Sequence, residues 1–346
     1  PRGIVASMAH VAVTGATGFI GSAVVRQLLE QRRSVRCLVE PGANNPYLQR
    51  NLEGLPVDVV PCDVTDHAAL KKALSGCETL YHLAAVYKTW LRDEELIHRV
   101  NLEGTVATLL AAQATGVRRI VYTSSIAAVG LVPGGLADET TKWNLFDVAN
   151  PYILTKWQSE RIAMRFAEGG LPVVVVNPGF PFGPRDVAPT PTGAIVLSVL
   201  QRKVPGWSQG GICTIDVDDC AAGHLLAEEK GRVGERYILG NDNVTLKELF
   251  EIVAKVAGVP APKLPMPSAL AAGVALGMEL WADHVSHSEP MATYRSVRYA
   301  QRNAFFSNAK AKRELGLPSR PLEETVRRAV EWFRGGYREI AAARGA

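Results

Sequence analysis

The fold of this chain is decided by Val11-Ala12-Val13-Thr14-Gly15-Ala16-Thr17-Gly18-Phe19-Ile20-Gly21, an apolar run that stops at a glycine and leads into a helical pattern. Each of the three glycines meets a steric demand. The first permits a tight turn, the second lets the backbone approach a pyrophosphate, and the third lets the helix pack closely on the strand. The first amides of the helix then face the phosphates with the positive end of the helix dipole behind them. The stretch predicts a dinucleotide site, with contacts from Gly15, Thr17, Gly18, Phe19, Ile20 and Gly21.

Composition bounds the class of protein. The 346 residues, 47% hydrophobic and 21% charged, are typical of a soluble globular chain with a full core. The net charge of +4 is small and no basic cluster alternates with aromatic residues, which argues against a nucleic-acid partner. The five cysteines are scattered without a Cys-x-x-Cys pair, so we expect buried thiols of a reducing compartment and no metal site.

The chain carries no basic segment leading into the apolar core of a secretion signal. It also lacks an uninterrupted run of about 18 apolar residues that could span a bilayer. We therefore expect a cytoplasmic protein without a membrane span. Residues 1–7 precede Met8, a natural start, and we expect them to be a cloning remnant; residues 335–346 are expected to form a C-terminal tail.

Strand-like segments alternate with helical patterns through the first 125 or so residues. The strands are expected at 34–39, 57–62, 79–85 and 118–123, after the first one, and a long helix of Ala and Leu opens near Asn101. This rhythm predicts an α/β fold of the Rossmann type. Its doubly wound parallel sheet binds its ligand at the carboxyl ends of the strands.

Side chains at these strand ends are candidates for binding adenosine. Glu40 follows the second strand, 19 residues after Gly21 (40 − 21), where a carboxylate accepts hydrogen bonds from the ribose hydroxyls and repels a 2′-phosphate. It predicts NAD, with NADP as the alternative; the competing interpretation is a solvated glutamate. Asp63, followed by Val64, either accepts from the adenine amino group or caps the next helix in competition with Asp66.

The fourth and fifth strands end in residues that suit a bound cofactor. The small residues at 83–85 (Leu83, Ala84 and Ala85) allow a ligand to lie against the backbone, and Thr123 ends the fifth strand. His82 lies inside an apolar run, so we interpret it as a core histidine and not as a ligand.

A tyrosine and a lysine one helical turn apart form the candidate catalytic pair. Asn150 is a good helix cap and Pro151 suits the first helical position, so Tyr152 lies in the first turn with Lys156 on the same face. A nearby ammonium and the helix dipole both favour phenolate, which would lower the pKa of Tyr152 toward the working pH of a general acid–base group. Ser125, at the end of a neighbouring strand, can bond the same substrate oxygen. A surface Tyr and Lys at chance helical spacing is the plainer alternative.

Gly15-x-x-Gly18-x-x-Gly21, Thr123-Ser124-Ser125 and Tyr152-x-x-x-Lys156 together resemble the extended short-chain dehydrogenase/reductase superfamily, that of the NAD-dependent epimerases and dehydratases. The resemblance runs from about Ala9 to Phe333. Within that group the chain is most similar to hopanoid-associated sugar epimerases, dihydroflavonol reductases and 3β-hydroxysteroid dehydrogenase/decarboxylases. The dihydroflavonol-reductase branch usually carries arginine where this chain has Glu40, which favours NAD over NADPH.

The resemblance implies a role for each matching residue. By this resemblance, Tyr152 exchanges a proton with the substrate oxygen, and Ser125 orients the carbonyl or alcohol. Lys156 binds the nicotinamide ribose and adjusts the pKa of Tyr152. Asn101 supports the surroundings of the lysine, and Pro178 lies near the nicotinamide. It also implies a homodimer through the helices at 102–115 and 152–168.

Past Pro178 the strand–helix rhythm loosens. We expect residues 8–178 and 212–243 to form the dinucleotide-binding domain, and 179–211 with 244–334 a smaller, mostly helical substrate-binding cap. The predicted pocket walls are Tyr87, Trp90, Ser125, Phe180 and Phe182. The apolar helix at 268–281 is too short to span a bilayer, and we expect it to be buried in the cap. The alternative is a lid that admits an apolar substrate or touches a membrane surface.

The sequence is compatible with three functions. The favoured one interconverts a secondary alcohol and a ketone on an apolar, sterol- or flavonoid-like substrate, with decarboxylation following if the product is a β-keto acid. The second is a nucleotide-sugar epimerase with tightly held NAD, whose diphosphate could use Arg185, Arg202 and Lys203. The third, a dinucleotide-sensing protein without catalysis, is disfavoured by the intact catalytic residues. A 4,6-dehydratase is disfavoured because Ile126-Ala127 replace the acid pair that it needs.

Overall fold

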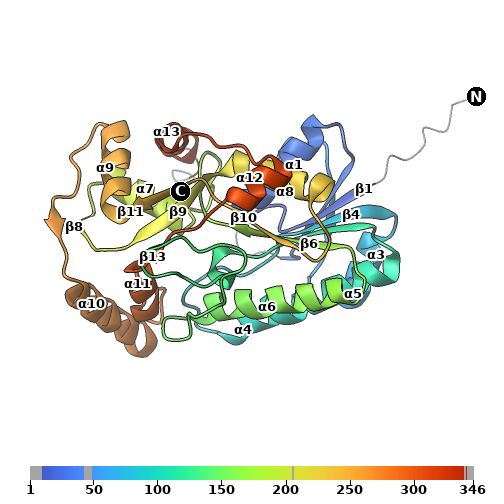
Figure 1. Ribbon diagram of the computed structural model, residues 1–346, viewed down its shortest axis with the longest axis horizontal. Coiled ribbons are helices and arrows are strands. Elements are labelled where there is room, and N and C mark those ends of the chain that lie inside the picture. The colour runs from blue at the N-terminus through green and yellow to red at the C-terminus, as the bar shows by residue number, and fades with distance from the viewer. Residues whose placement is uncertain (1–9, 43–48, 205, 339, 341–346) are drawn as a thin grey trace, which may run out of the picture.

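A seven-stranded parallel sheet forms the centre of the computed structural model, which describes residues 10–42, 49–204, 206–338 and 340 (Figure 1). The sheet has the order β10-β6-β5-β4-β1-β2-β3, and its carboxyl ends are aligned: Thr14 lies beside Leu38 of β2 and His82 of β4. The strand order reverses between β1 and β4, so the crevice for a ligand opens there. The predicted doubly wound α/β sheet is confirmed. Its strands are β1 (His10–Thr14), β2 (Val35–Val39), β3 (Asp58–Pro61), β4 (Cys77–His82), β5 (Arg119–Thr123), β6 (Val173–Pro178) and β10 (Arg236–Leu239).

Helices cover both faces of this sheet. Figure 1 shows α1 (Phe19–Glu30), α8 (Val217–Lys230) and α12 (Ala309–Leu315) on one face, and α3 (His67–Leu74), α5 (Gly104–Thr115) and α6 (Pro151–Glu168) on the other. Successive side chains of a strand point to opposite faces. On β4, Tyr81 therefore packs beneath α1 and α8, whereas Leu80 packs beneath α3 and α5. Two buried apolar layers result.

The long helix near Asn101 begins earlier than expected. It starts with α4 (Glu95–His98), passes through a π-helical turn at Arg99–Glu103 (η1) and continues as α5. Asn101 thus lies inside the wide turn and not at a helix start. The extra residue that a π turn inserts re-aims the side chains around it, which is why such turns gather at functional sites.

A second, smaller unit packs against the end of the main sheet. Its strand β9 (Gly211–Asp216) pairs with β7 (Phe180–Phe182), β11 (Asp242–Thr245) and β13 (Asn303–Ala304), and β8 (Gly206–Trp207) pairs with β12 (Leu264–Pro265). Three helices, α7 (Pro191–Leu200), α9 (Leu246–Ala257) and α13 (Leu322–Arg334), enclose its core. The segment 212–243 is therefore divided: α8 and β10 join the main sheet, whereas β9 and β11 belong to the second one.

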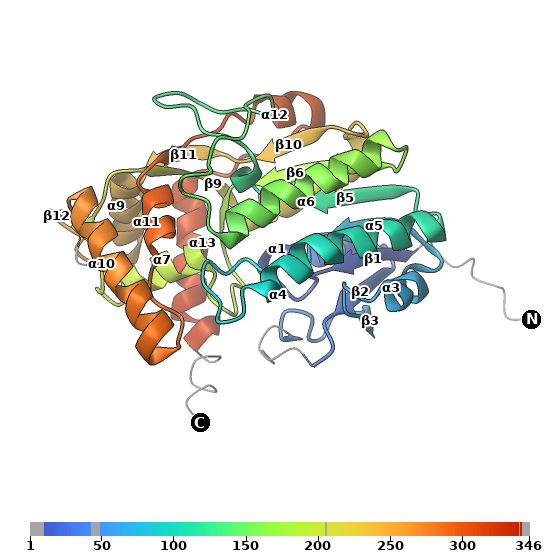
Figure 2. The ribbon, with the colours of Figure 1, turned by 90° about the horizontal axis from the view of Figure 1, so that it is seen from below.

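The apolar helix α10 (Ser268–Trp281) is a correction to the expectation of a buried cap helix. It pairs with α11 (Tyr294–Ala300) at the end of the molecule (Figure 2). Two of its residues, Ala272 and Ala275, are buried, while Leu270 is 59% and Trp281 61% exposed. Because small residues form the buried face, the large apolar side chains point outward.

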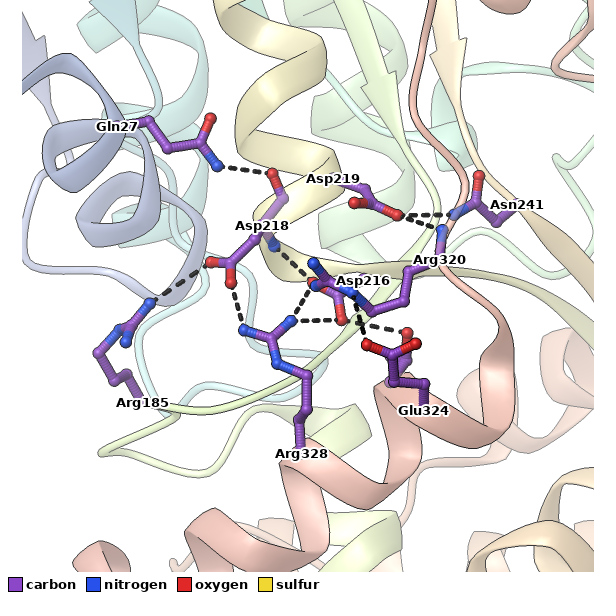
Figure 3. Close-up of polar contacts among 10 residues, drawn as sticks. Gln27, Arg185, Asp216, Asp218, Asp219, Asn241, Arg320, Glu324 and Arg328 are labelled. Carbon is purple, nitrogen blue, oxygen red and sulfur yellow. Dashed lines mark hydrogen bonds and ion pairs between the residues drawn. The ribbon is translucent and has the colours of Figure 1, made fainter. Parts of the chain in front are cut away.

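An ionic cluster joins the two units (Figure 3). Asp216, at the start of α8, has a fully buried carboxylate that pairs with Arg328 of α13 at 2.7 Å and with Arg320 at 2.8 Å. Arg328 also pairs with Asp218, which in turn contacts Arg185 at 3.4 Å. A buried charge needs such partners, so the second unit is held to the main sheet by charge as well as by apolar contact.

Candidate active site

The glycine turn has the form that a dinucleotide requires. Gly15 has a positive φ of 66°, and a Cβ atom there would lie 2.7 Å from the backbone nitrogen of Ala84. A Cβ on Gly21 would lie 2.1 Å from the carbonyl oxygen of Gly15, so the helix packs directly on the turn. At Gly18 the sole close atom would be that same oxygen, at 3.2 Å, which leaves the outer side of the turn open to a ligand.

The N-terminus of α1 is available to an anion. No side chain of the described residues caps it, whereas α6 to α9 are capped by side chains, listed here as Asn150, Thr190, Asp216 and Thr245. The first amides of Phe19 and Ile20 thus keep their donors for a phosphate. The turn and the free helix end together fit the pyrophosphate of a dinucleotide.

A pocket of about 770 Å³ lies beside this turn, where adenosine is expected. Thr17 and Glu40 line it, and Glu40 directly follows β2 as predicted. Arg50 also lines it. The sequence reasoning missed Arg50 because it lies ten residues past Glu40 (50 − 40), beyond the strand end where a ribose-binding side chain is sought.

The sequence left open whether Asp63 or Asp66 caps α3. Asp66 is the cap, because its side chain accepts a hydrogen bond from the amide of Ala69. One carboxylate oxygen of Asp63 accepts hydrogen bonds from the amide and the hydroxyl of Thr65, both at 2.8 Å. Val64, next to it, packs against Gly104 of α5.

The end of β1 is tied to the end of β4 and the segment that follows it, at the crevice. The hydroxyl of Thr14 accepts from the amides of Leu83 and Ala84, so it donates its hydrogen to Nδ1 of His82 at 2.8 Å. Burial lowers the pKa of His82 to about 3, so the ring is neutral. His82 is thus a core histidine, although its Nε2 is buried without a partner among the described residues. Ala85 continues the same segment.

The structure brings Ser125, Tyr152 and Lys156 together at the carboxyl end of the sheet. The Ser125 hydroxyl is near enough to the Tyr152 phenol to lower the pKa of that phenol. Lys156, 5% exposed, donates to the carbonyl oxygen of Thr123 at 2.8 Å. Asn150 caps α6 through the amide of Ile153, which sets Tyr152 in the first turn as expected. Pro178, buried at the end of β6, borders the same edge.

Burial controls the protonation of both groups. It raises the pKa of Tyr152, and the hydrogen bond with Ser125 partly offsets this. Burial lowers the pKa of Lys156 to about 8 against the opposing charge of Glu160. The expected lowering of the Tyr152 pKa by Lys156 is therefore wrong, because desolvation of the buried phenol sets the direction of the shift. Tyr152 is protonated at neutral pH and ready to donate.

Asn101 supports the helix that carries the lysine. Its amide group bonds the backbone of Val86 in both directions, at 2.8 and 2.9 Å, and donates to the hydroxyl of Thr155 at 3.0 Å. Thr155 precedes Lys156 and donates to the carbonyl oxygen of Tyr152. Asn101 thus links the segment after β4 to α6, without a direct bond to the lysine in the described structure.

The predicted pocket walls lie in different surroundings. Phe180 is half-buried against the same apolar cluster as Tyr152, and Tyr87 is 44% exposed. Trp90 bonds Asp283, just past α10, at 2.8 Å, so it bridges the main unit to the helical hairpin. Phe182 is 2% exposed in the core of the second unit, a packing position that disfavours contact with substrate. Sequence reasoning missed Tyr299 of α11, which packs against the same apolar cluster as Tyr152; no spacing in the sequence links the two.

Comparison with known proteins agrees with this geometry. Residues 11–240 match the NAD dependent epimerase/dehydratase family. A Synechocystis sp. protein with the provisional name dihydroflavonol 4-reductase is 38% identical over 331 residues, 94% of this chain and 95% of that protein. Sterol demethylase protein B of Methylococcus capsulatus is 32% identical over 323 residues, 93% and 97% of the two chains.

Solved structures give the same result. The crystal structure of gox2253 is 40% identical and superposes with a TM-score of 0.83 over 95% of this chain and 98% of that one. PA4631, a nucleoside-diphosphate-sugar epimerase from Pseudomonas aeruginosa, is 28% identical with a TM-score of 0.77, over 95% and 98% of the two chains. The likeness therefore extends through the second unit as well as the nucleotide-binding sheet.

Proposed function

The chain belongs to the NAD dependent epimerase/dehydratase family, as the sequence predicted, and on that premise we propose that it reduces a ketone to a secondary alcohol on an apolar, sterol- or flavonoid-like substrate. The observation that carries the proposal is the juxtaposition of Ser125 and the Tyr152 phenol, with the buried Lys156 one turn further along α6, at the crevice bordered by the glycine turn. Bound NADH supplies the hydride. The protonated phenol of Tyr152 then supplies the proton to the substrate oxygen, which Ser125 orients.

The same groups can run the reaction toward the ketone. Tyr152 must then accept the proton of the alcohol, which its raised pKa disfavours at neutral pH. If the alcohol carried a carboxylate beta to the new ketone, loss of carbon dioxide would follow without a further catalytic group. The sterol demethylase likeness supports this variant for a sterol-like acid.

The sugar-epimerase alternative is less well supported. Its diphosphate needs convergent cations, but Arg185 pairs with Asp218, and Arg202 and Lys203 lie past the far end of α7, roughly 14 Å from its first residue. At the N-terminal end of α7, the buried carboxylate of Asp186 accepts hydrogen bonds from the amide and the hydroxyl of the cap, Thr190. A carboxylate of the protein therefore already occupies the helix end that could otherwise bind a diphosphate.

Turnover separates these functions. We expect the protein to oxidise NADH in the presence of a dihydroflavonol or a 3-ketosteroid, and Tyr152→Phe to lower kcat by at least roughly 100-fold because the proton donor is lost. Tyr294→Phe makes the same chemical change at the start of α11 and is the matched control, which should keep full activity. Epimerisation of a nucleotide sugar without ketone reduction would overturn the proposal.

We propose NAD as the cofactor on the strength of Glu40. Glu40→Gln removes an acceptor for the ribose hydroxyls and should weaken NADH binding about tenfold while NADPH binding improves. Glu251→Gln makes the same change at an exposed position of α9, outside this pocket, and should leave both affinities unchanged. A titration that finds NADPH preferred in the unchanged protein would contradict this assignment.

We also propose that α10 contacts a lipid surface. Its outward apolar face suits such a surface, from which an apolar substrate could enter, although none of the described helices is long and apolar enough to cross a membrane.

A homodimer is the second proposed contact. Helices α5 and α6 support it, because they lie side by side on one outer face (Figure 2), where Leu110 is 43% exposed. Light scattering of the purified protein tests the dimer.

A further inference from the structure

Tyr299, on α11 of the second unit, ends in an unpaired hydroxyl. Its phenol oxygen is buried and has no hydrogen-bond partner among the described residues. Buried hydroxyls almost always find a partner, since an unpaired one has lost water and gained nothing. A native protein that keeps such a group usually uses it in another state, here one with a ligand bound.

The helix that carries Tyr299 is fixed to the start of the catalytic helix. Arg295 donates to the carbonyl oxygen of Ala149 at 2.6 Å, and Asn150, the cap of α6, donates to the hydroxyl of Ser296 at 3.4 Å. Figure 2 shows α11 beside the N-terminal end of α6. Tyr299 therefore has a defined position relative to the first turn of α6.

That position is on the same apolar cluster as the Tyr152 phenol. Tyr299, Tyr152 and Phe180 are half-buried side chains packed against this cluster. Burial raises the pKa of Tyr299, and Tyr152 is near enough for the charge of its phenolate to raise that pKa further. The Tyr299 hydroxyl thus keeps its proton and can donate a hydrogen bond.

In the proposed reaction, Ser125 and Tyr152 bind the reacting oxygen of the substrate. The donor on Tyr299 is left for another acceptor. We propose that Tyr299 binds the substrate by donating a hydrogen bond to a second oxygen, carried on the carbon next to the reacting carbonyl. This inference rests on the proposed reductase function and narrows it to ketones with an adjacent hydroxyl or comparable oxygen group.

A pair of flavonoid ketones tests the inference. Dihydroquercetin and eriodictyol have the same carbonyl and differ in the hydroxyl on the neighbouring carbon. The unchanged protein, loaded with NADH, should bind and reduce dihydroquercetin better. Tyr299→Phe should raise the KM and the dissociation constant for dihydroquercetin about tenfold and leave those for eriodictyol unchanged.

The stability of the variant distinguishes binding from packing. Removing an unpaired buried hydroxyl should leave the midpoint of thermal unfolding unchanged or higher. Tyr294→Phe makes the same chemical change on the same helix, away from the cluster around Tyr152, and should alter neither affinity nor stability.

Three results would overturn the inference. One is an unchanged protein that binds the two ketones equally, whether or not it turns them over; another is a Tyr299→Phe variant that keeps the preference; the third is an equal loss for both ketones. Failure of the proposed function has a different signature, namely absence of NADH oxidation with any ketone. Binding without turnover would thus reject the reductase while still deciding the role of Tyr299.

Discussion

At the scale of single residues, burial sets the protonation states of the tyrosine and the lysine in the candidate site. Tyr152 and Lys156 lie on one face of α6, yet burial moves their pKa values in opposite directions, toward a neutral phenol and a neutral amine. Between neutral pH and the pKa of Lys156, the pair holds the acid on the tyrosine and the positive charge on the lysine. This is the protonation state that ketone reduction needs.

The pH dependence of reduction follows from the lysine. The pKa of Lys156 is about 8, so we expect kcat/KM for ketone reduction to be level near pH 7 and to fall above about pH 8 as the ammonium is lost. Lys156→Arg should be slower but should lose this fall, because a guanidinium stays protonated. A steady-state pH profile of both proteins checks this; the same fall in the variant would assign it to another group.

The same shift affects stability with a definite sign. The folded chain holds Lys156 at a pKa of about 8 and the unfolded chain near the ordinary value of 10.5. Between these values the unfolded state binds more protons, so this residue makes the protein more stable as the pH rises through that window.

Residue spacing predicted much of this site. Gly15 to Gly21, Glu40, Ser125, Tyr152 and Lys156 stand in local patterns, strand ends or helical turns, that a sequence displays directly. Tyr299 and Arg50 do not. Tyr299 packs on the cluster around Tyr152 from a helix distant in sequence, and Arg50 lines the pocket ten residues past Glu40 (50 − 40), so no local spacing predicts either position.

At the scale of elements, periodicity located the strands and the helices of the main sheet but did not decide what covers α10. An apolar helix 14 residues long is typical of a buried one, and the sequence gives no sign that its small residues form the inner face. The large outward side chains are a feature that only packing reveals. Large exposed apolar patches of this kind usually mark an interaction site.

A lipid surface is the contact that we expect for α10. The double variant Leu270→Glu, Trp281→Glu should lower co-sedimentation with vesicles of phosphatidylcholine and phosphatidylglycerol about tenfold or more. Burying each of these two apolar side chains in the lipid would contribute roughly 1.5–3 kcal/mol to binding, and the variant loses that contribution. Leu136→Glu, 56% exposed on a loop, should not alter it. If the unchanged protein stays in the supernatant, α10 faces something other than lipid.

At the scale of the whole molecule, the site is assembled from both units. The main sheet supplies Ser125 and the helix of Tyr152, whereas Phe180 and Tyr299 come from chain segments past β6. Asp216 ends β9 of the second unit and caps α8 of the main one, and its fully buried carboxylate pairs with Arg320 and Arg328, about a hundred residues further along the chain. Charge therefore adds to apolar contact in holding the units together.

Loss of one of these arginines should therefore loosen the molecule. Arg328→Leu leaves the Asp216 carboxylate with Arg320 and Thr325 as partners, so we expect unfolding to cost about 3 kcal/mol less, at the low end for breaking a buried pair. The neighbouring Arg327 pairs with Glu323 on the surface at 3.6 Å, and Arg327→Leu should cost less than about 0.5 kcal/mol. Urea unfolding of the two variants compares them directly. Because the cluster joins α13 to α8, the second unit of Arg328→Leu should unfold at a lower urea concentration. The fluorescence of Trp332, on α13, should then change earlier in the titration. Equal stability of the two variants would mean that apolar packing, and not the buried charge, holds the units together.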